Sequence, residues 1–153
     1  MLKELLIDSG TLLEGEHWRR RRFRVNETIV REGERCGNVF VLLEGRVQVT
    51  GTVILAGRKI RPGYQILEAG DVFGELALLD GEPHVASVVG VTDGMVAVVP
   101  LEVLRDFLES HPETAARFYR RLAQILSGRL RRTDGKMLSL LGWGLKAHGY
   151  EAL

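Results

Sequence analysis

The chain has 153 residues and a net charge of +1 at pH 7, with 45% hydrophobic and 27% charged residues. This length favours one domain with a real hydrophobic core, and the small net charge excludes a global field that would attract nucleic acid or a membrane. The single cysteine, Cys36, excludes an internal disulfide, no apolar run approaches the roughly 18 residues of a membrane span, and the N-terminus lacks the apolar core of a signal peptide. We therefore expect a cytoplasmic protein.

The first segment, residues 1–22, is expected to be helical and then extended. Leucines at positions 2, 5 and 6 share one side of a helical turn over residues 2–8. The basic run at residues 18–25, WRRRRFRV, is mixed with aromatic residues. Because successive side chains of a strand point to opposite faces, its arginines are spread apart, which favours a solvated strand edge. A contact with nucleic acid or a membrane is the alternative.

Residues 23–100 have the texture of a β-structure. Short apolar runs alternate with glycine-containing or acidic turns, and these runs occupy residues 28–30, 39–43, 47–49, 52–55, 87–91 and 95–99. Regular short strands of this kind predict an antiparallel sandwich or barrel, such as a jelly roll, rather than a parallel α/β sheet. Residues 56–63 are expected at a hairpin tip that carries Arg58, Lys59 and Arg61.

The period becomes helical at Pro100. Apolar residues at positions 101, 104, 107 and 108 predict a helix that ends near Ser110, and Pro112 is suited to start a second helix. The second helix, residues 112–132, has an apolar stripe with arginines on its other sides, and its Gly128 favours a bend. We expect this helix either to pair with a copy of itself or to pack on the sheet of its own chain.

Beyond Thr133 the sequence predicts an apolar tail, residues 134–153, that is broken by glycines at positions 142, 144 and 149. The predicted layout is therefore an N-terminal segment (1–22), a β region (23–100), C-terminal helices (101–133) and this tail.

The stretch at residues 70–88, GDVFGELALLDGEPHVASV, predicts a short strand, a glycine, a one-turn helix and a new strand. Gly74 permits a positive φ or a close approach of the backbone to a ligand. The amides of Glu75, Leu76 and Ala77 fall in the first turn of the helix, where they lack intrahelical partners and suit an anion. Glu75 is the single acid between Phe73 and Leu79. Amides for a phosphate and a carboxylate for a ribose hydroxyl fit a phosphorylated sugar, and a plain connection is the alternative.

The run FGELALL…PHVASV resembles the phosphate-binding cassette of cyclic nucleotide-binding domains, whose usual form is FGE[LI]AL…PR[AST]A[ST]V. Residues 31–34 and 41–47 resemble the two glycine turns of that family, and residues 70–71 resemble the acidic turn ahead of the cassette. The resemblance covers roughly residues 22–132. It implies a mainly β fold with flanking helices: an antiparallel β roll, or jelly roll of the double-stranded β-helix type, followed by C-terminal helices.

The resemblance implies that the ligand contacts Phe73, Gly74, Glu75, Leu76, Ala77, His84, Val85, Ala86 and Ser87. The arginine that forks onto the cyclic phosphate in the family is replaced by His84. An imidazole offers fewer donors and is mostly neutral above pH ~6.5. We therefore expect affinity for cAMP or cGMP to fall about 10- to 150-fold unless an arginine of residues 58–61 reaches the phosphate. A simple turn role for His84 and a simple strand role for Ser87 are the alternatives, and Asp71 and Asp80 are expected to cap nearby amides.

The nucleotide base is expected against the second helix or the tail, where Tyr119, Arg129, Leu130 or Trp143 are the candidates for covering it. Adenine and guanine remain equal alternatives.

The resemblance implies a non-enzymatic sensor or regulatory domain that binds cAMP or cGMP and signals through its C-terminal helix. The implied partners are a second copy of the chain, bound through residues 112–132, and an effector protein. No metal or resident cofactor is expected, because the four histidines are scattered and no nucleophile–base motif is present.

Transcription regulators with this sensor append roughly 70 further residues with a helix-turn-helix, and about 20 remain here, so we expect no direct DNA binding. Neither is a membrane partner expected. The alternatives are a degenerate, ligand-free domain used for dimerisation or docking, and the sensor half of a longer regulator, channel or kinase system.

Overall fold

The computed structural model describes residues 2–35 and 37–149, so Cys36 and the last residues of the predicted tail lie outside the described residues. The chain divides between Ala115 and Ala116 into two compact units. The first unit opens with a π-helical turn, η1 (Glu4–Asp8), in which the amide of Ser9 donates to the carbonyl of Glu4 at 2.9 Å. Leu2 and Leu6 are buried in this unit, as their shared side of the predicted turn requires.

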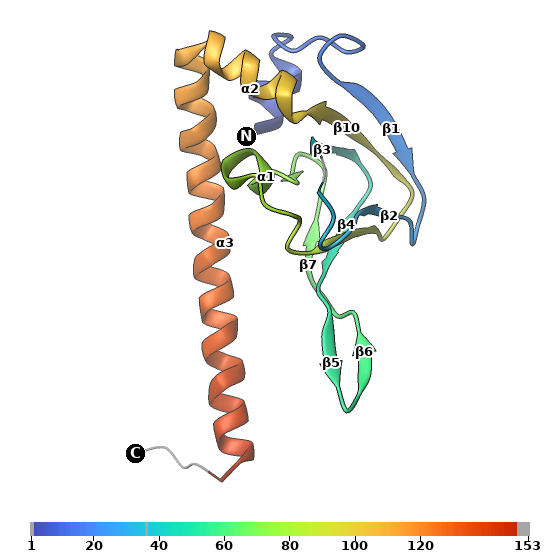
Figure 1. The fold of residues 1–153 in the computed structure, drawn as a ribbon, viewed down its shortest axis with the longest axis vertical. Coiled ribbons are helices and arrows are strands. Elements are labelled where there is room, and N and C mark those ends of the chain that lie inside the picture. The colour runs from blue at the N-terminus through green and yellow to red at the C-terminus, as the bar shows by residue number, and fades with distance from the viewer. Residues whose placement is uncertain (1, 36, 150–153) are drawn as a thin grey trace. The chain divides into compact units, whose positions relative to one another are not determined.

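Two four-stranded antiparallel sheets and a two-stranded hairpin make up the β region of the first unit (Figure 1). One sheet has the order β1-β10-β3-β8, the other has the order β2-β9-β4-β7, and β5 pairs with β6. The strands are β1 (Arg19–Phe23), β2 (Thr28–Val30), β3 (Asn38–Glu44), β4 (Val47–Thr50), β5 (Val53–Leu55), β6 (Arg58–Ile60), β7 (Gly63–Leu67), β8 (Val72–Phe73), β9 (Ser87–Gly90) and β10 (Gly94–Pro100).

The predicted antiparallel β roll is confirmed, and each of the six predicted strands is present. The hairpin tip is confirmed as well, with its turn at residues 56–57, Arg58 and Lys59 on β6, and Arg61 just after β6. Strand β7 was not predicted. Its sequence, GYQIL, shows no apolar run because Tyr64 and Ile66 face outward and only Leu67 is buried.

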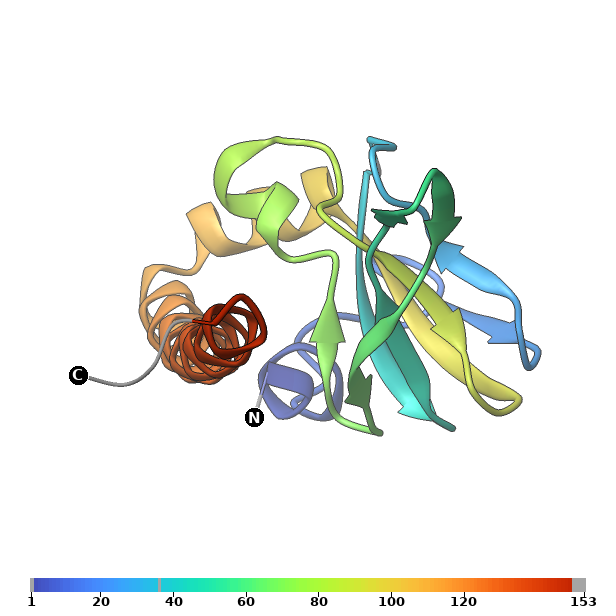
Figure 2. The same ribbon diagram turned by 90° about the horizontal axis from the view of Figure 1, so that it is seen from below.

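The core of the first unit lies between the two sheets (Figure 2). Phe23, Phe40 and Val98 come from one sheet, and Val47 and Val88 come from the other. Alternate residues of each strand point inward, so apolar side chains spaced by two positions meet in one layer. This layer supports β8, the strand that leads into the cassette.

The basic run lies on β1, at the edge of its sheet, as predicted. The guanidinium of Arg20 donates from Nε to Oε1 of Glu14 at 2.8 Å and lies 5.6 Å from the centre of the Trp18 ring. Arg21 pairs with Glu27 at 3.3 Å. These local pairs and the exposure of the strand agree with the interpretation of a solvated edge.

Three α-helices complete the described chain: α1 (Leu76–Asp80), α2 (Leu101–Ser110) and α3 (Pro112–Ala147). The prediction that the second C-terminal helix ends near Thr133 is wrong, because α3 continues without interruption through the predicted tail. Each glycine costs a helix about 1 kcal/mol relative to alanine, but the residues between them include strong helix formers such as leucine, methionine and lysine, and no proline. The helix ends just before Gly149, whose φ is +84°.

Within the described residues no helix combines the length and the apolar character that crossing a membrane would require. The second unit, which consists mainly of α3, nevertheless exposes large apolar side chains at positions 130, 137, 138, 140, 141, 143 and 145.

Candidate functional site

Strand β8 ends at Phe73, and the next residue of the cassette, Gly74, has a φ of +77°. A Cβ on this residue would lie 3.1 Å from the carbonyl oxygen of Asn38 and 3.3 Å from Cδ2 of Phe40. Phe73 stacks on Phe40 with ring centres 5.1 Å apart, which holds this approach in place. The positive φ therefore favours glycine here, and the tight contacts of a Cβ add to this preference.

Glu75 directly precedes α1 and is only 3% exposed, although it carries an acidic side chain. Its carbonyl accepts a hydrogen bond from the amide of Leu78 at 3.0 Å, which closes the first turn. A carboxylate at this end of a helix lies near the first-turn amides and the positive end of the helix dipole. The side chain is therefore directed into the protein at the start of α1 rather than into bulk water.

His84 is fixed by backbone hydrogen bonds to the first glycine turn. The amide of Gly33 donates to the carbonyl of His84 at 2.8 Å, and the amide of His84 donates to the carbonyl of Glu34 at 3.1 Å. Its imidazole reaches back to the cassette, with Cε1 3.7 Å from the position of a Cβ on Gly74. The structure therefore brings His84 and the Gly74–Glu75 step together across nine residues of chain.

The Nε2 atom of His84 is buried and has no hydrogen-bond partner in the described part of the chain. Burial lowers the pKa of His84 below 6.5, while the carboxylates of Glu34 and Glu75 act in the opposite direction. This direction of the pKa favours the neutral imidazole at pH 7. A buried polar atom without a partner carries an energetic penalty, which a ligand atom that accepts or donates a hydrogen bond would remove.

The other predicted site residues divide into buried and exposed positions. Phe73, Ala77 and Ala86 are buried, whereas Leu76 and Val85 are exposed beside them. Because these five side chains are apolar, these residues can offer a ligand polar contacts only through their backbone.

Ser87 is buried, and its Oγ accepts a hydrogen bond from the amide of Glu32 at 2.9 Å. The hydroxyl therefore has a structural role on β9, and its own proton remains available for donation. The predicted capping roles of two aspartates are confirmed: Asp71 accepts from the amide of Glu68 at 2.8 Å, and Asp80 accepts from the amide of Glu82 at 2.9 Å.

Arg105 was not foreseen. Its Nη2 donates to the carbonyl of Ala77 at 3.2 Å and lies 3.5 Å from the carbonyl of Leu78. In the sequence it is the one arginine on the polar side of α2, and nothing in the periodicity of that helix shows what it faces. The candidates for covering the base all lie on α3, and Tyr119, Leu130 and Trp143 among them are exposed.

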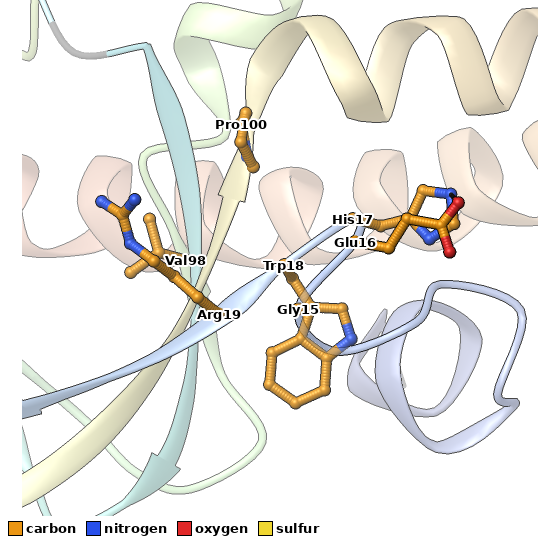
Figure 3. Close-up of a pocket in the computed structure, with 7 residues that line it drawn as sticks. All are labelled: Gly15, Glu16, His17, Trp18, Arg19, Val98 and Pro100. Carbon is orange, nitrogen blue, oxygen red and sulfur yellow. Dashed lines mark ion pairs between the residues drawn. The ribbon is translucent and has the colours of Figure 1, made fainter.

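A hollow of about 140 Å³ lies beside β1 and β10 (Figure 3). Its lining comes from residues 15–19 and from Val98 and Pro100, so it shares no residue with the cassette. Across the described residues, no group of three or more histidine, cysteine, aspartate or glutamate side chains is placed to hold a metal ion.

Comparison with known proteins identifies the family. The family model described as "Cyclic nucleotide-binding domain" matches residues 20–111, which include both glycine turns, the cassette and α2. The chain is 26% identical over 123 residues to a CRP-like cAMP-activated global transcriptional regulator of Mycobacterium tuberculosis. That alignment covers 78% of this chain and 50% of the relative, so the chain spans about half the length of this curated relative.

Solved structures give the same fold. A cyclic nucleotide-binding domain from Methylobacillus flagellatus superposes with a TM-score of 0.71 at 23% identity, covering 80% of this chain and 67% of the other. The catabolite activator protein of Thermus thermophilus superposes with a TM-score of 0.66 at 26% identity, covering 87% of this chain and 64% of the other.

Proposed function

The chain belongs to the cyclic nucleotide-binding domain family, and from this we propose that it is a regulatory domain that binds cAMP or cGMP in its cassette. The observation that carries the proposal is the convergence of three residues: Gly74 with its positive φ, the buried carboxylate of Glu75, and the buried, unpartnered Nε2 of His84. The similarity to a relative that is named as cAMP-activated supports this choice of ligand class.

In this proposal the first-turn amides of α1 bind the cyclic phosphate, because they have no acceptor within the helix. The carboxylate of Glu75 accepts a hydrogen bond from a ribose hydroxyl. His84 supplies one hydrogen bond to the phosphate through Nε2. Since a neutral imidazole replaces a charged, bidentate guanidinium, affinity is weaker than an arginine at this position would give.

The test is calorimetric titration with cAMP, cGMP and a cyclic dinucleotide at pH 7. We expect one of the two cyclic mononucleotides to bind and the dinucleotide to bind more weakly. The variant Glu75→Gln preserves the shape of the side chain and removes its charge, so it should weaken binding by about 10- to 150-fold. Asp80→Asn, at the far end of α1, is the matched control and should bind as the natural chain does.

A domain that has lost its ligand and serves for dimerisation or docking is the second candidate, and His84 in place of an arginine favours it. The same titration separates the two candidates. Absence of heat and of any thermal stabilisation with either cyclic mononucleotide at millimolar concentration would support the ligand-free alternative and contradict binding.

We further propose that α3 signals by pairing with the α3 of a second copy. A heptad repeat runs along α3. We call its a and d positions the seam, and they are Ala116, Tyr119, Ala123, Leu126, Leu130, Thr133, Met137, Leu140, Gly144 and Ala147. This 3–4 spacing is typical of a two-stranded coiled coil. The three large apolar residues of its second half, at positions 130, 137 and 140, are exposed in the single chain. The second half of the repeat therefore exposes these apolar side chains in the single chain.

One pair of flanking charges fits a parallel pair of identical helices. In such a pair, a residue flanking the seam lies opposite the residue five positions further along the partner helix. Arg129 and Asp134 are five residues apart in these flanking positions, so each arginine would face an aspartate of the other copy. This complementarity favours a second copy in parallel register as the occupant.

A further inference from the structure

The guanidinium of Arg105 joins two elements that are distant in sequence. Arg105 lies on α2, which is anchored by the buried side chains of Leu101, Leu104 and Phe107. From this helix its Nη2 reaches the carbonyls of Ala77 and Leu78 on α1, at 3.2 and 3.5 Å. The cassette helix is thus held from its C-terminal side by a charged group of a different helix.

The C-terminal end of α1 needs such a donor. Gly81 adopts a left-handed φ of +69° and returns its amide to the carbonyl of Ala77 at 3.0 Å. The next amide, that of Glu82, donates to the carboxylate of Asp80 at 2.9 Å and so turns away from the helix. The last carbonyls of a helix lack intrahelical donors and carry the negative end of its dipole, where a cation is stabilising.

We propose that Arg105 is a positioning residue for the ligand site: it holds α1 against α2 and thereby fixes Glu75 at the other end of α1. The helix is only five residues, or about 7.5 Å, long, so its two ends move as one body. Losing the anchor at Ala77 and Leu78 lets the helix tilt, which displaces the Glu75 carboxylate and the first-turn amides together. The ligand part of this inference rests on the function proposed above.

The experiment compares Arg105→Met with Arg105→Lys, and uses Arg22→Met as the control. Arg22 is an exposed arginine of β1, so this control removes the same charge without touching α1. Without ligand, amide exchange measured by NMR should be about fivefold or more faster for α1 in Arg105→Met, with the amides of β10 unchanged. Titration with cAMP should show a dissociation constant about three- to tenfold higher. In Arg105→Lys both changes should be smaller than in Arg105→Met, because lysine keeps the charge but not the planar fork of the guanidinium.

Each result decides the inference. Unchanged exchange in α1 would overturn the anchoring, whatever the nucleotide does. Faster exchange throughout the β roll, with a lowered unfolding temperature, would show a general structural role and also overturn it. Faster exchange confined to α1 with unchanged affinity would overturn the effect on the ligand site. If the natural chain binds neither cAMP nor cGMP, the proposed function fails, and exchange in α1 alone decides whether Arg105 anchors the helix. Should Arg105→Met not fold, Arg105→Gln, which keeps hydrogen-bond donors without the charge, provides the same comparison.

Discussion

The cassette and the second half of α3 are both rich in apolar residues and glycine, yet their surroundings are opposite. Around the cassette, Phe73 and Leu78 are buried, and Gly74 and Gly81 take positive φ values at the ends of short elements. In α3, Trp143 is 73% exposed, and glycines at positions 128, 135, 142 and 144 continue the helix. The same residue type therefore acts differently in the two regions. Glycine lies at the end of a short element around the cassette, whereas in α3 it is accommodated within a continuous helix.

The two regions also differ in the kind of partner that their exposed or unpaired groups would suit. Among the buried side-chain atoms of the described residues, Nε2 of His84 lacks a hydrogen-bond partner, and a small ligand could satisfy it. The second half of α3 instead exposes several large apolar side chains, among them Leu130, Met137 and Leu140, and exposed apolar patches of this kind are typical of interaction surfaces. The predictions below test the proposed partner of each region, from the largest expected effect to the smallest.

The largest effect is expected on dimerisation, for a substitution on the seam of α3. Leu140, 70% exposed, lies on the proposed seam, and Leu138, 64% exposed, lies off it. Leu140→Asp would bury two unpaired carboxylates per dimer and should weaken dimerisation by about 3 kcal/mol or more, roughly 100-fold. Leu138→Asp is the matched control and should leave the dimer intact. Sedimentation equilibrium measures both, and equal behaviour of the two variants would contradict the seam.

The next largest effect is expected on nucleotide affinity when an arginine replaces His84. His84→Arg should tighten cAMP or cGMP binding by about tenfold or more, because a bidentate, charge-assisted pair replaces one neutral hydrogen bond. Titration calorimetry of the variant and the natural chain gives the ratio. The double variant Glu75→Gln with His84→Arg shows whether the gain depends on the same pocket. Unchanged affinity in His84→Arg would place the phosphate elsewhere.

The fold and the cassette could be predicted from the sequence because their signals are local. Short apolar runs between turns indicate the strands, and the order Phe73, Gly74, Glu75 indicates the step from β8 to α1. The backbone pairing of His84 with the turn at Gly33 could not be predicted, because it joins residues about 50 positions apart.

The length of α3 and the role of Arg105 were missed for different reasons. Glycine propensity predicted a broken tail, but Gly142 and Gly144 do not outweigh their helix-forming neighbours, and α3 ends only before Gly149. The carbonyls that Arg105 contacts belong to a separate helix, so the pattern of α2 gave no sign of them.

A pH dependence of ligand binding follows from His84. In the free protein burial lowers the pKa of His84 below 6.5, and an anionic phosphate in contact would raise it. Between these two pKa values binding takes up a proton, so affinity should increase as pH falls, by up to about tenfold per pH unit. Calorimetry in buffers of different ionisation enthalpy measures this uptake. His84→Gln should abolish it, and zero uptake in the natural chain between pH 5 and 8 would exclude contact with the phosphate.

The same group affects the stability of the free protein in the opposite sense. Because the folded-state pKa of His84 is lowered, the folded state binds fewer protons than the unfolded state, and stability present above pH 6.5 is lost as pH falls toward the folded-state pKa. Urea unfolding at pH 7.5 and pH 5.5, with His84→Gln as the control, should show a fall in the free energy of unfolding that the variant lacks in part.

The smallest effect concerns the two glycines that bracket α1. Gly74 and Gly81 have similar φ values, +77° and +69°, so alanine at either position should cost about 1–2 kcal/mol from backbone strain. A Cβ at Gly74 also meets the carbonyl of Asn38 at 3.1 Å, whereas a Cβ at Gly81 meets no atom within 4 Å. Gly74→Ala should therefore be less stable than Gly81→Ala by about 1 kcal/mol in urea unfolding. Equal losses would mean that β3 yields to the extra methyl group, and that crowding is not what reserves this position for glycine.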